Sequence, residues 1–147
     1  MRVTYSMATE LHIFIDDSRV PSREAWQRAI EQLGFPAVLD SSLDLRRDTG
    51  FTPTTYEGKT SGFEFYLEPT ASVLSGYSHI TPKVGDRDKC VTLRWGSNLT
   101  ECAAALSAAA ALAKLTDGIY FYPDDDVLYN ADEAIEATRR DLSSIRS

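Results

Sequence analysis

The sequence predicts a two-layer α/β (α+β) domain in which a mixed β-sheet is packed by about three helices. Residues 90–95 and 118–122 are short apolar runs rich in β-branched and aromatic side chains, and an alanine-rich segment, 98–115, separates them. Residues 22–33 place apolar side chains at helical spacing, whereas residues 62–67 alternate apolar and polar side chains as a strand does. Strand-like runs interleaved with helical runs are typical of this fold class.

The length of 147 residues fits one domain over residues 1–147, of which residues 1–8 are expected to form a flexible tail. The composition, with 43% hydrophobic and 25% charged residues, is ordinary for a globular protein with one core. No apolar run approaches the roughly 20 residues that a membrane span needs, and the N-terminus lacks the apolar stretch of a signal peptide. We therefore expect a cytoplasmic protein with no membrane partner.

The first strand and the first helix are predicted near the N-terminus. Residues 10–15 are a compact apolar run that ends in turn-forming acidic residues. Ser22 can cap a helix over residues 22–33, and Gly34 can end it in the left-handed conformation. The inward face of this helix would carry Trp26, Ile30 and Leu33.

The middle of the chain is less regular. Residues 51–56 are predicted as an edge strand, because Pro53 cannot donate a hydrogen bond to a neighbouring strand. Residues 62–67 follow as a strand with alternate phenylalanines on one face. Residues 69–89 form the longest predicted loop, to which the apolar side chains within residues 73–80 can add a short strand.

Two capping boxes mark the starts of the later helices. Asn98 and Asn130 are each followed three residues later by a glutamate, and this pattern predicts helices over residues 98–115 and 130–145. The first of these helices contains eight alanines between positions 103 and 113. Because small side chains permit close approach to a sheet, we expect it to be the central packed helix.

Few side chains indicate chemistry. Cys90 and Cys102 are expected to be small buried groups, since two cysteines do not make a disulfide framework. His12 and His79 lie far apart and lack the spacing of metal ligands. No catalytic motif is present, so we predict no catalytic residues, no metal and no cofactor.

The negative charge is concentrated in one window. The net charge is −7, and the stretch from Asp117 to Glu136 contains seven acidic residues and no lysine or arginine. Elsewhere the remaining 15 acidic residues balance the 15 lysines and arginines. Binding to nucleic acid through phosphates needs lysine and arginine, so no nucleic-acid partner is expected. An acidic face suits a basic protein partner, although acidic residues at a turn and a helix start can also simply solvate the surface.

Three segments resemble a known family. Residues 61–64 (SGFE), residues 93–96 (LRWG) before the alanine-rich helix, and residues 112–120 (LAKLTDGIY) are similar to immunity proteins of bacterial polymorphic toxin systems. The nearest of these accompany contact-dependent growth inhibition toxins. The resemblance implies a small cytoplasmic protein, without enzymatic activity, that binds and neutralises one cognate toxin domain, often a nuclease.

The acidic window is the predicted partner-binding face of such a protein. A basic nuclease presents positive charge where nucleic acid would lie, and an acidic surface can occupy that place. Exposed tyrosines of the window can act as anchors. The residues predicted to bind the partner are Asp124, Asp125, Asp126, Asp132, Glu133, Glu136, Tyr122 and Tyr129, with Tyr120 as a further aromatic candidate.

Two other classes of function remain open from the sequence. Asp16, Asp17 and Glu64 could support a small metal-dependent hydrolase or transferase, because paired carboxylates hold divalent cations at phosphoryl-transfer sites. The chain could also be a ligand-sensing domain of an oligomer. The sequence does not determine the oligomeric state.

Overall fold

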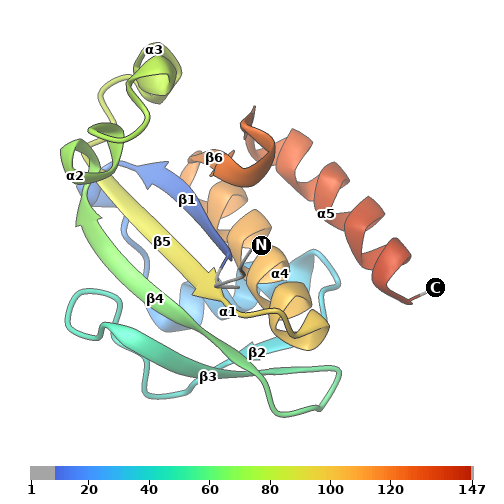
Figure 1. Ribbon diagram of the computed structural model, residues 1–147. Helices are drawn as coiled ribbons and strands as arrows, with labels where there is room; N and C mark the ends of the chain where they lie inside the picture. The colour runs from blue at the N-terminus through green and yellow to red at the C-terminus, as the bar shows by residue number, and fades with distance from the viewer. Residues whose placement is uncertain (1–8, 147) are drawn as a thin grey trace, which may run out of the picture.

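A seven-stranded β-sheet with three long helices on one face forms the protein in the computed structural model, which describes residues 9–146 (Figure 1). The strands are β1 (Thr9–Ile15), β2 (Ala37–Leu39), β3 (Gly50–Tyr56), β4 (Gly62–Pro69), β5 (Lys89–Trp95), β6 (Ile119–Tyr122) and β7 (Val127–Tyr129). The helices are α1 (Arg23–Gln32), α2 (Thr70–Leu74), α3 (Thr81–Val84), α4 (Leu99–Thr116) and α5 (Ala131–Arg146). The predicted α+β fold is confirmed. The expected tail, residues 1–8, lies outside the described residues.

The sheet is antiparallel throughout, whereas a mixed sheet was predicted. Its strand order is β2-β3-β4-β5-β1-β6-β7, and each neighbouring pair runs antiparallel. The strands on either side of α4 do run parallel to one another, but β1 lies between them and pairs with both. Apolar runs specify that a segment is a strand without specifying its neighbour, so this insertion could not be deduced from the pattern.

The main core lies between the sheet and the helices. Alternation along β1 directs Leu11, Ile13 and Ile15 toward the helices. Every residue from Ala103 to Ala113 is buried, as the prediction of a central packed helix requires. The indole Nε1–H of Trp26 on α1 donates to a carbonyl of α4 over 2.8 Å and so joins the two helices. By length and composition α4 could cross a membrane, but 67% of it is buried within this fold.

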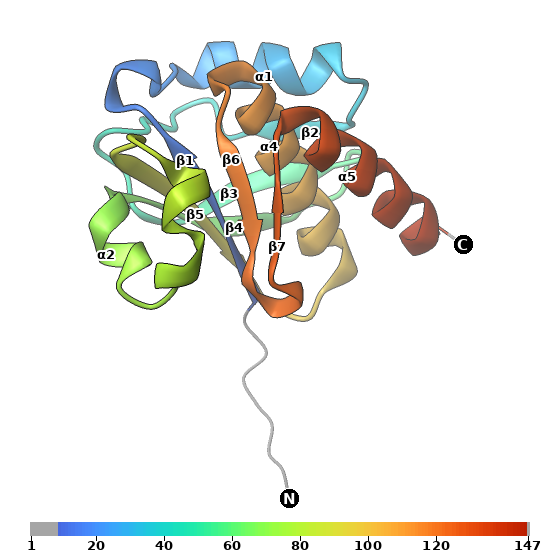
Figure 2. The same cartoon turned by 90° about the horizontal axis from the view of Figure 1, so that it is seen from above.

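Residues 69–89 fold over the opposite face of the sheet instead of forming a loop with a short strand. They contain the two short helices α2 and α3, and Figure 2 shows α2 on the side of the sheet away from α5. Below these helices a second apolar cluster is buried, formed by Phe14, Val73, Ile80, Val84, Cys90 and Phe121. This small third layer covers only one end of that face.

β3 is an interior strand, so its prediction as an edge strand is wrong. Residues 54–56 pair with β2, and residues 50–53 pair with β4. Thr54 N–H donates toward β4, so the nitrogen of Pro53 points to the other side, where β2 has already ended. The proline is tolerated because no hydrogen bond is required there. The edge strands of the sheet are β2 and β7.

Both predicted caps are present at the starts of α4 and α5. Asn130 Oδ1 accepts from Glu133 N–H, and Glu133 Oε1 accepts from Asn130 N–H, each over 2.9 Å, which is a complete capping box. Asn98 Oδ1 accepts from the backbone of Thr100 and Glu101. The Glu101 carboxylate accepts from the N–H of Gly96 at 3.2 Å and not from that of Asn98. The cap of α4 therefore differs in this one contact from the complete capping box of α5.

Candidate functional site

A groove of about 400 Å³ lies between α4, α5 and the β6–β7 hairpin. Three tyrosines line it, namely Tyr120, Tyr122 and Tyr129, and we call it the tyrosine groove. Its lining also includes Cys102 from α4 and two carboxylates, Asp125 and Asp141. Two of the tyrosines and Asp125 belong to the predicted partner-binding face.

Strand alternation in the hairpin turns the tyrosines toward the helices. Tyr120 lies opposite Tyr129 in the β6–β7 ladder, and Tyr122 lies opposite Val127. The intervening Phe121 faces the second apolar cluster on the other side of the sheet. A 3₁₀ turn at Pro123–Asp125 joins the strands, and Asp126 closes it in the left-handed conformation with φ 52°. Of the consecutive acidic residues at this turn, Asp125 lines the groove, whereas Asp126 contacts His79.

Aromatic contacts fix the walls of the groove. The ring of Tyr122 stacks on that of Trp95, with centroids 6.5 Å apart and an interplanar angle of 6°. Tyr120 and Tyr129 are tilted rings 5.8 Å apart. Tyr120 is only 5% exposed, and its hydroxyl has no hydrogen-bond partner within residues 9–146. The oxygen is not among the fully buried unpartnered atoms of the described chain, so it keeps some exposure and is open to water or to a ligand in the groove.

The hydroxyls of Tyr120 and Tyr122 stay protonated in this environment. Burial, and then the nearby Cys102, Asp124 and Asp125, raise the pKa of Tyr122 to about 12. Burial, and then Tyr122 and Asp141, raise the pKa of Tyr120 further. Asp141 also contributes to the raised pKa of the Cys102 thiol, whose main cause is burial. Asp141 lines the same groove as both phenols and the thiol, so the groove carries negative charge beside its aromatic walls.

The predicted acidic residues differ in how far they are engaged. Asp126 pairs with His79 at 2.7 Å, and Asp132 pairs with Lys114 at 3.2 Å. Glu136 pairs with Arg140 at 3.2 Å, and Glu133 belongs to the capping box described above. Asp124 and Asp125 are exposed and have no ion-pair partner in the described part of the chain. Asp117 and Glu133 likewise have no ion-pair partner among residues 9–146, but only Asp124 and Asp125 are adjacent in sequence, at the hairpin turn.

The carboxylates of the alternative enzyme hypothesis are far apart. Asp17 accepts from Arg46 at 2.9 Å, and this hydrogen bond lowers the pKa of Asp17. Glu64 lies opposite Arg94, which in turn lies opposite Glu10 near the start of β1. Asp16 follows the other end of β1, about 20 Å along the strand at roughly 3.3 Å per residue. The prediction that Asp16, Asp17 and Glu64 serve one metal ion is therefore wrong.

A buried polar cluster on the opposite sheet face was not predicted. His12 Nδ1 lies 2.8 Å from Thr92 Oγ1, which donates to Glu68 at 3.0 Å. Cys90 Sγ lies 3.7 Å from the same histidine nitrogen. Burial raises the pKa of the Cys90 thiol and lowers the pKa of His12 to about 4. Both groups are thus neutral near pH 7, and the thiol is not activated as a nucleophile.

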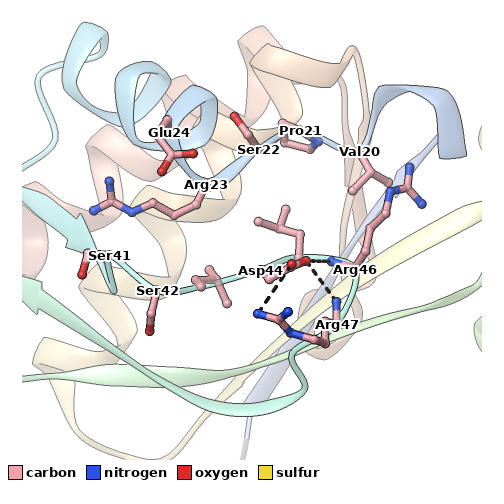
Figure 3. A pocket seen from close by; sticks show the side chains of 12 residues that line it. Val20, Pro21, Ser22, Arg23, Glu24, Ser41, Ser42, Asp44, Arg46 and Arg47 are labelled. Carbon is pink, nitrogen blue, oxygen red and sulfur yellow. Dashed lines mark hydrogen bonds and ion pairs between the residues drawn. The ribbon is translucent and has the colours of Figure 1, made fainter.

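A second hollow, of about 460 Å³, lies between the start of α1 and residues 41–47 (Figure 3). Three arginines line it, as an anion site would require. Arg23 donates to two backbone carbonyls at the end of β2. Arg46 donates to Asp17, and Arg47 pairs with an adjacent aspartate, as the dashed lines to Asp44 show. Since each guanidinium already has a partner, these arginines serve to hold the loop in place.

Sequence reasoning missed the contribution of α4 and α5 to the tyrosine groove. Ala137, Asp141 and Ile145 recur every four residues on α5, and all three line the groove. That spacing was the available signal for Asp141. Among residues 9–146, no group of three or more His, Cys, Asp and Glu side chains is placed to hold a metal ion. No protein-family model, curated protein or solved structure matches this chain.

Proposed function

We propose that this chain is an immunity protein that binds and neutralises a cognate bacterial toxin domain, with a basic nuclease as the expected partner. The hairpin turn between β6 and β7 is the centre of the binding face. The chemistry of the partner follows from the charge of this face, because an acidic surface attracts a basic one and repels other acidic proteins. The resemblance of residues 61–64, 93–96 and 112–120 to immunity proteins supports the same class.

One observation carries the proposal. The whole charge imbalance of the protein comes from residues 117–136, and two exposed carboxylates of that window, Asp124 and Asp125, have no ion-pair partner within residues 9–146. Unpaired like charges in adjacent positions repel one another, and a cationic partner relieves that repulsion.

The tyrosines next to this turn support a protein partner in particular. Tyrosine is enriched at the energetically dominant positions of protein interfaces, where a ring packs and a hydroxyl stays hydrogen-bonded. Tyr122 and Tyr129 are half-buried, so part of each ring remains available. An acidic turn beside aromatic anchors combines electrostatic steering with a site for close packing.

The test starts from the gene directly upstream, which on this proposal encodes the toxin. The C-terminal domain of that product is expressed in bacteria alone and together with this chain, and growth is recorded. We expect growth arrest by the domain and its relief by this chain. The variant carrying Asp124→Lys and Asp125→Lys should give much weaker protection.

A matched control separates the position of the charge from its amount. Glu24→Lys with Asp86→Lys changes the net charge by the same amount at exposed positions outside the acidic window. This control should protect as the native chain does. Equal protection by all three proteins, or no relief by the native chain, would count against the proposal.

A further inference from the structure

The tyrosine groove has the features of a site for one arginine side chain. We propose that it receives an arginine of the partner protein, held between the tyrosine rings and the carboxylates of Asp125 and Asp141. This inference rests on the proposed function for the source of the arginine. The groove itself is argued from its own geometry.

The first feature is the aromatic wall. A guanidinium stacks on aromatic faces and is more weakly hydrated than an ammonium, so arginine is favoured over lysine at such a wall. The rings of Tyr120 and Tyr129 lie 5.8 Å apart, and the ring of Tyr122 is nearly parallel to that of Trp95. These contacts fix the rings before a ligand arrives, and this reduces the ordering cost of binding.

The second feature is the Tyr120 hydroxyl. The side chain is 5% exposed and lines the groove, yet its oxygen has no hydrogen-bond partner in the described chain. The oxygen is not fully buried and belongs to the lining of the groove, so a ligand there can reach it. A guanidinium presents five N–H donors in a fixed plane, one of which this oxygen can accept.

The third feature is charge complementarity. Asp125 and Asp141 line the groove, and neither has an ion-pair partner within residues 9–146. Arg140 also contributes to the lining, but it is engaged by Glu136 at 3.2 Å. Two carboxylates facing three aromatic rings leave the groove negative, which matches a cation and excludes an anion. A volume of about 400 Å³ lies within the usual range of ligand sites, roughly 300–1,000 Å³.

The experiment needs no partner protein. The ¹⁵N-labelled full chain is titrated with N-acetyl-arginine N-methylamide and followed by backbone amide chemical shifts. We expect saturable shifts at Tyr122, Tyr129 and Asp141. The citrulline analogue, which has the same shape without charge, should bind at least about fivefold more weakly because the cation–aromatic and ionic contacts are lost. Equal binding of the two probes, or shifts confined to other surfaces, would overturn the inference.

Variants test the site within the chain. Tyr129→Leu keeps an apolar side chain but removes a ring face, and it should weaken arginine-probe binding by about fivefold. Asp141→Asn is isosteric at an exposed position and should weaken it by a similar factor. Tyr66→Leu is the control, because Tyr66 lies on β4 and bonds to Glu64 outside the groove. The lysine analogue should bind more weakly than the arginine analogue, and tighter lysine binding would contradict the choice of arginine.

The outcome with the toxin domain distinguishes this inference from the proposed function. If Asp124→Lys with Asp125→Lys abolishes binding while Tyr129→Leu and Asp141→Asn leave it unchanged, the acidic face is the binding site and the arginine pocket is wrong. If the arginine probe binds the groove but the upstream domain does not bind the chain, the pocket stands and the immunity function fails.

Discussion

Mild acidification should destabilise the fold through His12, the buried histidine of β1. The ring is 2% exposed and lies between Tyr77 and Phe121, with centroids at 5.9 and 6.2 Å. Burial disfavours the imidazolium and lowers the pKa of His12 to about 4, although Glu68 opposes this shift. In the unfolded chain the histidine has its ordinary pKa of about 6.5. The unfolded state therefore binds a proton between these values that the folded state does not.

The size of the effect follows from the difference in pKa. A difference of about 2.5 units corresponds to a maximum loss of about 3 kcal/mol in the free energy of unfolding. The stability contributed by neutral His12 is complete above about pH 6.5 and falls as the pH is lowered toward 4. Between about pH 7.5 and pH 5, before most carboxylates titrate, the loss should be about 2 kcal/mol.

Urea unfolding at a series of pH values measures this loss. In His12→Gln the loss between about pH 7.5 and 5 should disappear even if the variant is less stable overall, because only the slope is compared. His79→Gln removes the other histidine, which is exposed, and should keep the slope. Glu10 Oε2 lies 3.2 Å from His12 Nε2 and would form an ion pair with it only if the ring were protonated; within residues 9–146 this nitrogen makes no hydrogen bond. If Glu10 and Glu68 outweighed burial, stability would instead rise on acidification, and that result would refute the reasoning.

Three further changes test the packing. A Cβ at Gly118 would lie 2.8 Å from Ile13 Cγ2, so Gly118→Ala should lower the free energy of unfolding in urea by about 1–3 kcal/mol. Gly96→Ala is the control and should lower it much less, because a Cβ at Gly96 would meet only the flexible carboxylate of Glu101. Trp26→Phe removes the buried 2.8 Å hydrogen bond to α4 and should lower the unfolding free energy by about 1–3 kcal/mol, measured by the same assay, and no loss would contradict that contact. Asn130→Ala removes the cap of α5 and should cost about 1 kcal/mol, with Asn130→Asp as the conservative control in thermal unfolding.

The elements set by local pattern were predictable. Ser22 accepts from Ala25 N–H as a helix cap, and α1 ends within one residue of the predicted position. The alternation of β4 buries Phe63 and Phe65 as expected. In each case the signal is a spacing or a cap within a few residues of chain.

The features that were missed depend on distant partners. α2 and α3 are too short to be stable by propensity alone and fold because Val73 and Val84 pack on Phe14 and Phe121. The position of β1 between β5 and β6 depends on strand pairing across about 80 residues, which no local pattern encodes. The short-strand prediction around residues 73–80 failed for the same reason.

The candidate site was likewise predictable from local sequence only in part. Tyr122, Tyr129 and Asp125 could be named from the sequence because charge and aromatic side chains are adjacent there. Their meeting with Asp141 required α5 to pack beside the hairpin, which is a tertiary event. The shared metal site of Asp16, Asp17 and Glu64 failed through geometry, because Glu64 on β4 lies level with the start of β1 and Asp16 follows its end.

The most direct test of the central claim is the calorimetric affinity of this chain for the upstream toxin domain at low and high salt. The account predicts tight binding that weakens as salt rises, because salt screens the attraction between the acidic hairpin turn and the basic toxin domain. In the variant carrying Asp124→Lys and Asp125→Lys, affinity should fall and most of the salt dependence should disappear. An affinity and a salt dependence that are unchanged in this variant would contradict the account.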